Sequence, residues 1–251
     1  MSQDSGVSRA GPPPAVSERL RRHRLLRGHP MEPFRLKGAD GLEDVVGALR
    51  LVHDSYVALG LMDPHPSGLR LLPHHLLPET RVFLAREGDE VVATLTLIPD
   101  SEVGLPLDAA YRREADALRL AGRRVAEISC LALAARYRRH DLLLHLFRLM
   151  HVYARHAGLD DLCVVVAPKH GRFYQHILLF EELGHYTELP HLNGAPARLY
   201  RQDLRTIEAA TRDQYADSPA ASDLYRFFFE EAEAVRPVAL GGRGLTPEEC
   251  R

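Results

Sequence analysis

The chain has 251 residues, 45% of them hydrophobic, which is enough to bury one sizeable core. Its formal net charge of -2 gives no whole-molecule reason to expect a nucleic-acid partner. No apolar run approaches the roughly 18 residues that a membrane span needs, and no apolar signal segment opens the chain. We therefore expect a cytoplasmic protein without an integral membrane segment.

The cysteines and histidines do not predict a metal site. Cys130, Cys163 and Cys250 form no close-spaced pair, and the first two lie in apolar, strand-like runs. This pattern favours a reducing compartment over disulfides or structural zinc. Residues 61–80 are rich in Pro and His but lack ligand spacing, so we expect a solvated loop and no metal.

Composition divides the chain into three parts. Residues 1–30, rich in Ser, Gly, Pro and Arg, bury little apolar surface and predict a disordered basic arm. Residues 31–204 carry the patterns of helices and strands and predict one domain. Residues 205–251 predict a C-terminal helical extension that finishes in a Gly- and Pro-rich tail.

The first half of the domain predicts two helices around a hairpin. Residues 42–59 have apolar side chains at helical spacing and stop at Gly60. Residues 81–86 and 90–98 are β-type runs on either side of a short turn, which predicts an antiparallel hairpin. A Gly- and Pro-containing loop then leads to a predicted helix over residues 108–120.

The second half alternates strands with helices. It predicts strands at 125–133, 162–166 and 197–204, a helix at 142–156, and another helix over 168–184. The order of elements is typical of an α/β fold whose mixed sheet is antiparallel first and parallel around the 125–133 and 162–166 strands.

The strand predicted at 125–133 looks buried on both faces, yet it contains Glu127. Because strand side chains alternate, Glu127 and Ser129 share a face with Val125, Leu131 and Leu133. An ionised carboxylate in apolar surroundings is costly unless it is paired or its pKa rises.

Two interpretations of Glu127 follow. Either a buried arginine such as Arg123 or Arg50 neutralises the carboxylate, or Glu127 serves in proton transfer. In the second case burial raises its pKa above the usual value of about 4.3, closer to working pH.

Several short stretches, in this order over roughly residues 45 to 204, are more informative together than alone. They are Leu77–Phe83, Ala93–Ser101, Gly104–Asp108, Gly122–Ser129, Pro168–His170 with Phe173 and Tyr174, and Gly194–Ala197. The set resembles the N-acyl amino acid synthases, which are GNAT-like acyltransferases related in fold to the acyl-homoserine-lactone synthases.

The resemblance implies a GNAT-like mixed, mostly antiparallel sheet with splayed central parallel strands, flanked by helices. It implies transfer of a long-chain fatty acyl group from an acyl carrier protein thioester to the α-amine of an amino acid acceptor. The only cofactor implied is the donor's phosphopantetheine arm. In the lactone synthases the strand with Glu127 and Ser129 usually continues with Arg, where this chain has Cys130.

Aminolysis of a thioester needs an amine freed of its extra proton and donors for the developing oxyanion. Glu127 is the candidate base, directly or through one water, and Ser129 the residue that orients the water or the amine. Backbone N–H groups near Leu131 to Leu133 are candidates for the oxyanion if a bulge splays the strands.

The turn after the predicted strand 125–133 indicates which acyl donor the protein uses. GNAT enzymes that use coenzyme A usually have glycines there, which let the backbone close around a diphosphate. Residues 138–143 contain no glycine and include an Asp, which disfavours coenzyme A. Arginines are the candidates for steering an acidic carrier protein, although a solvated helix start explains them equally simply. They are Arg136, Arg138, Arg139 and Arg148.

Other candidate contacts divide into three groups. Apolar side chains are candidates for an acyl tunnel, since each buried CH₂ contributes about 0.8 kcal/mol. These are Leu131, Val164, Val166, Phe173 and Phe180, with Leu133 as a further candidate substrate contact. His170 and Tyr174 lie where a donor arm would pass, and Asp100 and Ser101 where the acceptor would bind. For each, packing, capping or turn formation is the simpler alternative.

Two rival functions remain open. The first keeps the fold but uses acyl coenzyme A and another amine, and the missing glycines count against it. The second is a non-catalytic acyl-binding module, and a carboxylate retained in a hydrophobic strand counts against that.

Overall fold

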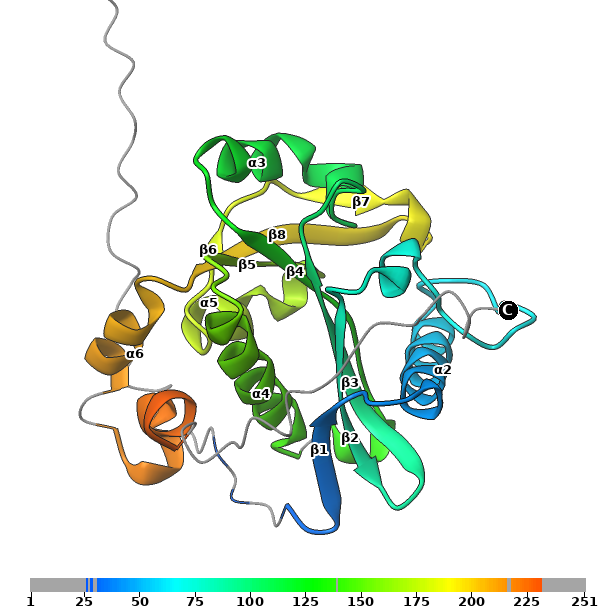
Figure 1. Cartoon of the computed structure of the whole chain (residues 1–251), viewed down its shortest axis with the longest axis horizontal. Helices are drawn as coiled ribbons and strands as arrows, with labels where there is room; N and C mark the ends of the chain where they lie inside the picture. The colour runs from blue at the N-terminus through cyan, green and yellow to red at the C-terminus, as the bar shows by residue number, and fades with distance from the viewer. Residues whose placement is uncertain (1–25, 27, 29–30, 139, 216–217, 232–251) are drawn as a thin grey trace, which may run out of the picture.

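The computed structural model describes residues 26, 28, 31–138, 140–215 and 218–231, and these residues form an eight-stranded mixed sheet covered by helices on both faces (Figure 1). The strand order is β1-β2-β3-β4-β5-β8-β6, with β7 paired to β8. Only β4 and β5 pair in parallel among these strands. The strands are β1 (Phe34–Gly38), β2 (Arg81–Glu87), β3 (Glu90–Pro99), β4 (Val125–Leu133), β5 (Asp161–Val166), β6 (Glu181–Glu182), β7 (Thr187–Leu189) and β8 (Ala195–Asp203).

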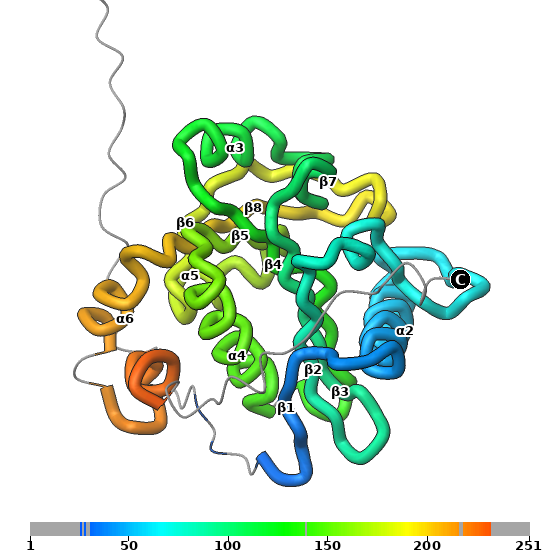
Figure 2. Tube along the Cα trace, viewed as in Figure 1, coloured from blue at the N-terminus to red at the C-terminus, as the bar shows by residue number. Residues whose placement is uncertain are grey.

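The helices lie on two sides of this sheet. They are α2 (Leu42–Ala58), α3 (Asp108–Leu120), α4 (Leu142–His156), α5 (Gly171–His176) and α6 (Ile207–Tyr215). Figures 1 and 2 show α2 and α4 on either side of the β1–β3 strands, with α3 near the N-terminal end of β4. Single helical turns at 73–76, 135–137, 168–170, 190–192, 220–222 and 226–230 connect the elements. The GNAT-like α/β fold predicted from the sequence is confirmed.

The largest part of the core lies on the α4 face. Phe83, Leu95 and Leu97 of the sheet pack there against Leu146 and Met150 of α4, and all are almost completely buried. Full burial of such side chains stabilises the fold by about 1.5–3 kcal/mol each. Smaller clusters on the other face lie under α2 and α3.

Two expectations about local structure were wrong. The helix after Pro168 ends at His176 rather than near Gly184, since Leu179 has a positive φ of 56° and β6 pairs with β8. Tertiary pairing overrides the helical pattern there. Strand β1 was missed because it is a short edge strand with Arg and Lys among its few residues.

The C-terminal helical segment is part of the same core. Ile207, Leu224 and Phe227 belong to the α4-side cluster, and the Tyr215 hydroxyl donates to the Ile177 carbonyl at 3.0 Å. The predicted tail beyond residue 231 lies outside the described residues. So does the predicted arm, apart from Leu26 and Gly28, which donate to the Ala221 carbonyl and the Asp141 carboxylate.

A bulge in β4 sets the geometry of the middle of the sheet. Thr94 pairs with Ala132 but Thr96 with Ser129, so β4 has one residue more than β3 across this step. Cys130 sits in the bulge with a φ of 49°, in the left-handed region. Because the alternation shifts by one, the expectation that Leu131 and Leu133 share the face of Glu127 was wrong.

The paired part of β4 and β5 ends at the same place. Their parallel pairing runs from Val125–Asp161 to Ile128–Val164, whereas β4 continues to Leu133 and β5 to Val166. Beyond Ile128 the two strands pair only with their outer neighbours, β3 and β8. The central parallel pair is therefore splayed, as expected.

Candidate active site at the opened pair of strands

Glu127 lies in the paired half of β4, one residue before the two strands part. Its side chain is only 5% exposed, and its Oε2 accepts the N–H of Leu107 at 2.6 Å. Leu107 is the residue before α3, so the carboxylate faces the positive end of that helix. Among the described residues, no Lys, Arg or His nitrogen lies within 4.0 Å of it.

Burial raises the pKa of Glu127 to about 8, and the nearby charge of Asp108 adds to the rise. The Leu107 N–H and the Ser129 hydroxyl oppose it, but they do not offset the loss of water. A carboxyl group with such a pKa accepts and returns a proton near neutral pH. This is the property expected of a general base.

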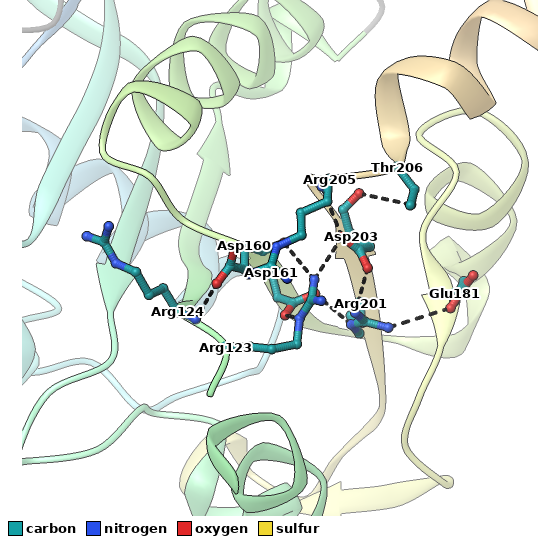
Figure 3. Close-up of polar contacts among 9 residues, drawn as sticks. All are labelled: Arg123, Arg124, Asp160, Asp161, Glu181, Arg201, Asp203, Arg205 and Thr206. Carbon is teal, nitrogen blue, oxygen red and sulfur yellow. Dashed lines mark hydrogen bonds and ion pairs between the residues drawn. The ribbon is translucent and has the colours of Figure 1, made fainter. Parts of the chain in front are cut away.

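The alternative of an arginine that neutralises Glu127 was wrong. The Arg123 guanidinium pairs with Asp161 and Asp203, at the start of β5 and the end of β8 (Figure 3). Arg50 is exposed on α2. Neither arginine therefore compensates the buried carboxylate.

The bulge brings Cys130 onto the face that Ser129 already shares with Glu127. Ser129 Oγ lies 3.9 Å from Cys130 Sγ, as expected when adjacent side chains in a bulge point the same way. Cys130 is 3% exposed, and burial raises the pKa of its thiol. A buried thiol with a raised pKa is a poor nucleophile, so this cysteine packs rather than reacts.

Two residues beside the bulge were not predicted. The Arg70 guanidinium lies over the Tyr56 ring, with Cζ 4.9 Å from the ring centroid. Arg70 is close enough to Cys130 to oppose the rise in its pKa. Tyr56 lies in the apolar stripe of α2, and Arg70 lies in a loop without a motif. No sequence signal therefore marks either residue as part of the site.

The loop between β3 and α3 holds the N–H that faces Glu127. Asp100 accepts two hydrogen bonds from Arg119, at 2.7 and 2.8 Å, and Asp108 accepts two more. Ser101 is exposed, and its carbonyl accepts the Gly104 N–H. The structure thus places Asp100 and Ser101 in the loop that positions Leu107.

The candidate acyl residues gather on the α4 face. They are Leu131, Leu133, Val164, Val166, Phe173 and Tyr174, all in or against the main core cluster. His170 is exposed on the turn that follows β5. The remaining tunnel candidate, Phe180, belongs to the same cluster and lines a separate small cavity between α4 and the C-terminal segment, which none of the other candidates lines.

The candidate docking arginines differ in their surroundings. Arg136 is exposed and pairs with Glu90 and Glu87, and Arg138 is exposed beside it. Arg148 instead packs on the Phe227 ring, 4.3 Å from its centroid, and pairs with Glu231. Arg139 lies outside the described residues.

A carboxylate stands at the start of α4, where a diphosphate would bind in a glycine-rich turn. Asp141 immediately precedes the helix, and its side chain accepts the Gly28 N–H at 2.9 Å. Its negative charge is favourable at a helix N-terminus and unfavourable for a second anion there.

Comparisons with known proteins identify the family and the fold. The family model of the N-acyl amino acid synthase FeeM matches residues 47–203, whereas no curated protein matches the chain. The structure is similar to that of FeeM, an N-acyl amino acid synthase from uncultured soil microbes, with a TM-score of 0.63 and 24% identity. That likeness covers 70% of this chain and 93% of FeeM.

Two acyl-homoserine lactone synthases share the fold. BjaI, which is coenzyme A-dependent, has a TM-score of 0.52 and 18% identity, over 74% of this chain and 92% of its own. LasI has a TM-score of 0.51 and 13% identity, over 68% of this chain and 89% of its own.

The described residues include no helix long and apolar enough to cross a membrane. The family match covers more than half of the sequence and includes β4, the strand on which Glu127 and Ser129 lie. The chain belongs to the N-acyl amino acid synthase FeeM family and is an acyltransferase.

Proposed function

We propose that this protein transfers a long-chain fatty acyl group from an acyl carrier protein thioester to the α-amine of an amino acid. The observation that carries the proposal is Glu127, a buried carboxyl group with no cationic partner among the described residues, beside an opened pair of strands. Membership of the FeeM family supports an acyl transfer to an amino acid.

Glu127 removes a proton from the ammonium group of the acceptor, and Ser129 orients the amine. The freed nitrogen attacks the thioester carbonyl, and N–H groups of β4 beyond the bulge, near Leu131 to Leu133, stabilise the oxyanion. The intermediate collapses as the C–S bond breaks and the amide C–N bond remains. The proton on Glu127 passes to the leaving thiolate. The ionised Glu127 then takes the second proton from the nitrogen and releases it to water, so the products are the amide, the thiol and one free proton.

The two faces of the sheet suit the two substrates. Polar groups gather on the α2 and α3 face, where Glu127 and Ser129 lie and where the loop with Asp100 and Ser101 crosses. Apolar side chains of the α4 face accommodate the acyl chain. They are Leu131, Leu133, Val164, Val166, Phe173 and Tyr174. The opening between β4 and β5 is where we place the thioester, with His170 near the donor arm.

The surroundings of α4 favour a carrier protein over coenzyme A. Asp141 occupies the start of the helix, and the preceding turn has no glycine to let a backbone close on a diphosphate. The exposed Arg136 and Arg138 offer positive charge to an acidic carrier protein. No cofactor is needed beyond the phosphopantetheine arm. The buried free thiols of Cys130 and Cys163 support a cytoplasmic location.

The test compares two donors with the same acyl chain. Purified protein is mixed with a long-chain acyl carrier protein thioester or the matching acyl coenzyme A, together with single amino acids, and products are identified by mass spectrometry. We expect N-acyl amino acids, formed faster from the carrier protein. Products from coenzyme A alone, or only with amines that are not amino acids, would contradict the proposal.

A further inference from the structure

Arg70 carries a positive charge that no carboxylate in the described part of the chain neutralises. Its Nε is buried without a hydrogen-bond partner, and its Nη1 lies 3.8 Å from the sulfur of Met62, a weak acceptor. Among residues 26–231 as described, no Asp or Glu oxygen comes within 4.0 Å of the guanidinium. Burying part of a guanidinium without an anionic partner is unfavourable.

Three other partly buried arginines have their charge balanced by carboxylates. Arg119 binds Asp100 and Asp108, and Arg123 and Arg201 both bind Asp161. The fold supplies carboxylates to these three guanidinium groups, and Arg81, which has none among the described residues, donates to the carbonyls of Pro78 and Thr80. At Arg70 the described residues supply no carboxylate.

Arg70 lies on the same face as the candidate base. Its guanidinium stacks on Tyr56, and both border Cys130, whose side chain adjoins Ser129. The neighbouring His75 is not a second cation for an anionic ligand. Burial, with smaller effects of the nearby His74 and Arg70, lowers its pKa to about 4, so the imidazole is neutral near pH 7.

The spacing along β4 fits one α-amino acid. Cys130 follows Glu127 by three residues, which would span about 10 Å of regular strand and span somewhat less here because Cys130 sits in the bulge. A charge-assisted hydrogen bond at each end and the backbone of one amino acid between them add up to about 9 Å. An acceptor whose amine reaches Glu127 can therefore place its carboxylate toward Arg70.

We propose that Arg70 binds the α-carboxylate of the acceptor, an inference that rests on the amino acid acceptor of the proposed function. The planar guanidinium forms two parallel N–H bonds to a carboxylate, and Tyr56 holds its plane in place. The pair of charges, Arg70 at one end and Glu127 at the other, fixes which end of the acceptor meets the thioester. Cys130 between them provides a small apolar floor.

The test uses the amino acid that the wild-type enzyme acylates best and the carboxamide of that amino acid, which keeps the amine but lacks the negative charge. For Arg70→Met we expect the KM for the amino acid to rise about 10- to 100-fold, the loss of a charged hydrogen-bond pair. The kcat/KM for the carboxamide should stay unchanged, so the preference for the carboxylate disappears.

Arg81→Met is the matched control. Arg81 is also a partly buried arginine without a carboxylate partner among the described residues, but it lies over Tyr153 of α4, 5.6 Å from the ring centroid. We expect it to leave the preference intact. Thermal unfolding checks each variant, and if Arg70→Met does not fold, Arg70→Lys decides, with a rise in KM confined to the amino acid expected.

The possible results separate the role of Arg70 from the proposed function. A preference retained in Arg70→Met, or an equal loss on both acceptors, would overturn the role of Arg70 while leaving the reaction standing. Equal use of both acceptors by the wild-type enzyme would overturn it too. Failure of the wild-type enzyme to acylate any amino acid would instead remove the proposed function, and would be seen before any variant is made.

Discussion

Two buried carboxylates on adjacent strands have opposite surroundings. Asp161, at the start of β5, is fully buried and is bound by Arg123 and by Arg201, whose Nε lies 2.7 Å from Oδ1 (Figure 3). Glu127, on the neighbouring β4, is 5% exposed and accepts one backbone N–H. A carboxylate that only stabilises the fold receives cations, and one that must exchange a proton does not.

Buried Asp44 on α2 follows the first pattern. Burial alone would raise its pKa, but contacts with Lys37 and Arg86 lower the pKa to about 2. Burial raises the pKa of Glu127 to about 8. Cations beside Asp44 thus outweigh the effect of its burial, whereas no cation among the described residues offsets the burial of Glu127.

The ion pairs around Asp161 also hold the closed end of the opened strands. Arg123 precedes β4, Asp161 begins β5 and Asp203 ends β8, so their contacts join three chain segments (Figure 3). The parallel pairing of β4 and β5 starts there and stops at Ile128. A rigid closed end keeps the open end in a fixed place.

Neutralising the unpaired carboxylate should have the largest effect. We expect Glu127→Gln to lower kcat about 100- to 10,000-fold, the contribution of a general base, while the protein stays folded. Steady-state kinetics and thermal unfolding measure the two quantities. Undiminished turnover would remove Glu127 from the mechanism.

Neutralising Asp161, the carboxylate that is paired with arginines, should lower the stability of the protein and not its activity. Asp161→Asn leaves Arg123 and Arg201 short of negative charge, and we expect the free energy of unfolding to fall by about 3 kcal/mol. Urea unfolding measures this value. The kcat of the folded fraction should remain near that of wild type, and a loss as large as that of Glu127→Gln would erase the distinction between the two groups.

The bulge in β4, beyond Glu127, should tolerate some side chains better than others. A β-branched residue is strained at the positive φ of Cys130, so we expect Cys130→Val to be about 1–2 kcal/mol less stable than Cys130→Ala. Comparing the two variants by urea unfolding removes the effect of losing the thiol. Equal stabilities would mean that the bulge relaxes without cost.

The smallest effect is expected from a charge reversal at Arg138, an exposed residue after β4. Arg138→Glu should raise the KM for the acyl carrier protein about threefold at low salt, with less effect at high salt. Arg113→Glu, the same charge change on an exposed position of α3, is the control. Equal effects of the two variants would place the docking surface elsewhere.

The sequence predicted the regular elements well and the irregular ones poorly. The bounds of α3 and β4 agree with the expectation because periodicity and glycine stops mark them. The bulge carries no such mark, since Cys130 stands where a glycine would have signalled it. Glu127 was found because a charge interrupts an apolar run. Arg70 was not, because its importance depends on which carboxylates the fold brings near it.

The most direct test is the proton affinity of Glu127. An infrared titration of the wild-type protein, minus that of Glu127→Gln, isolates the carboxyl stretch of this one residue. We expect it to ionise near pH 8, and kcat/KM to rise with pH through the same value, because the ionised form is the base. A carboxyl group already ionised at pH 5 would contradict the role of Glu127.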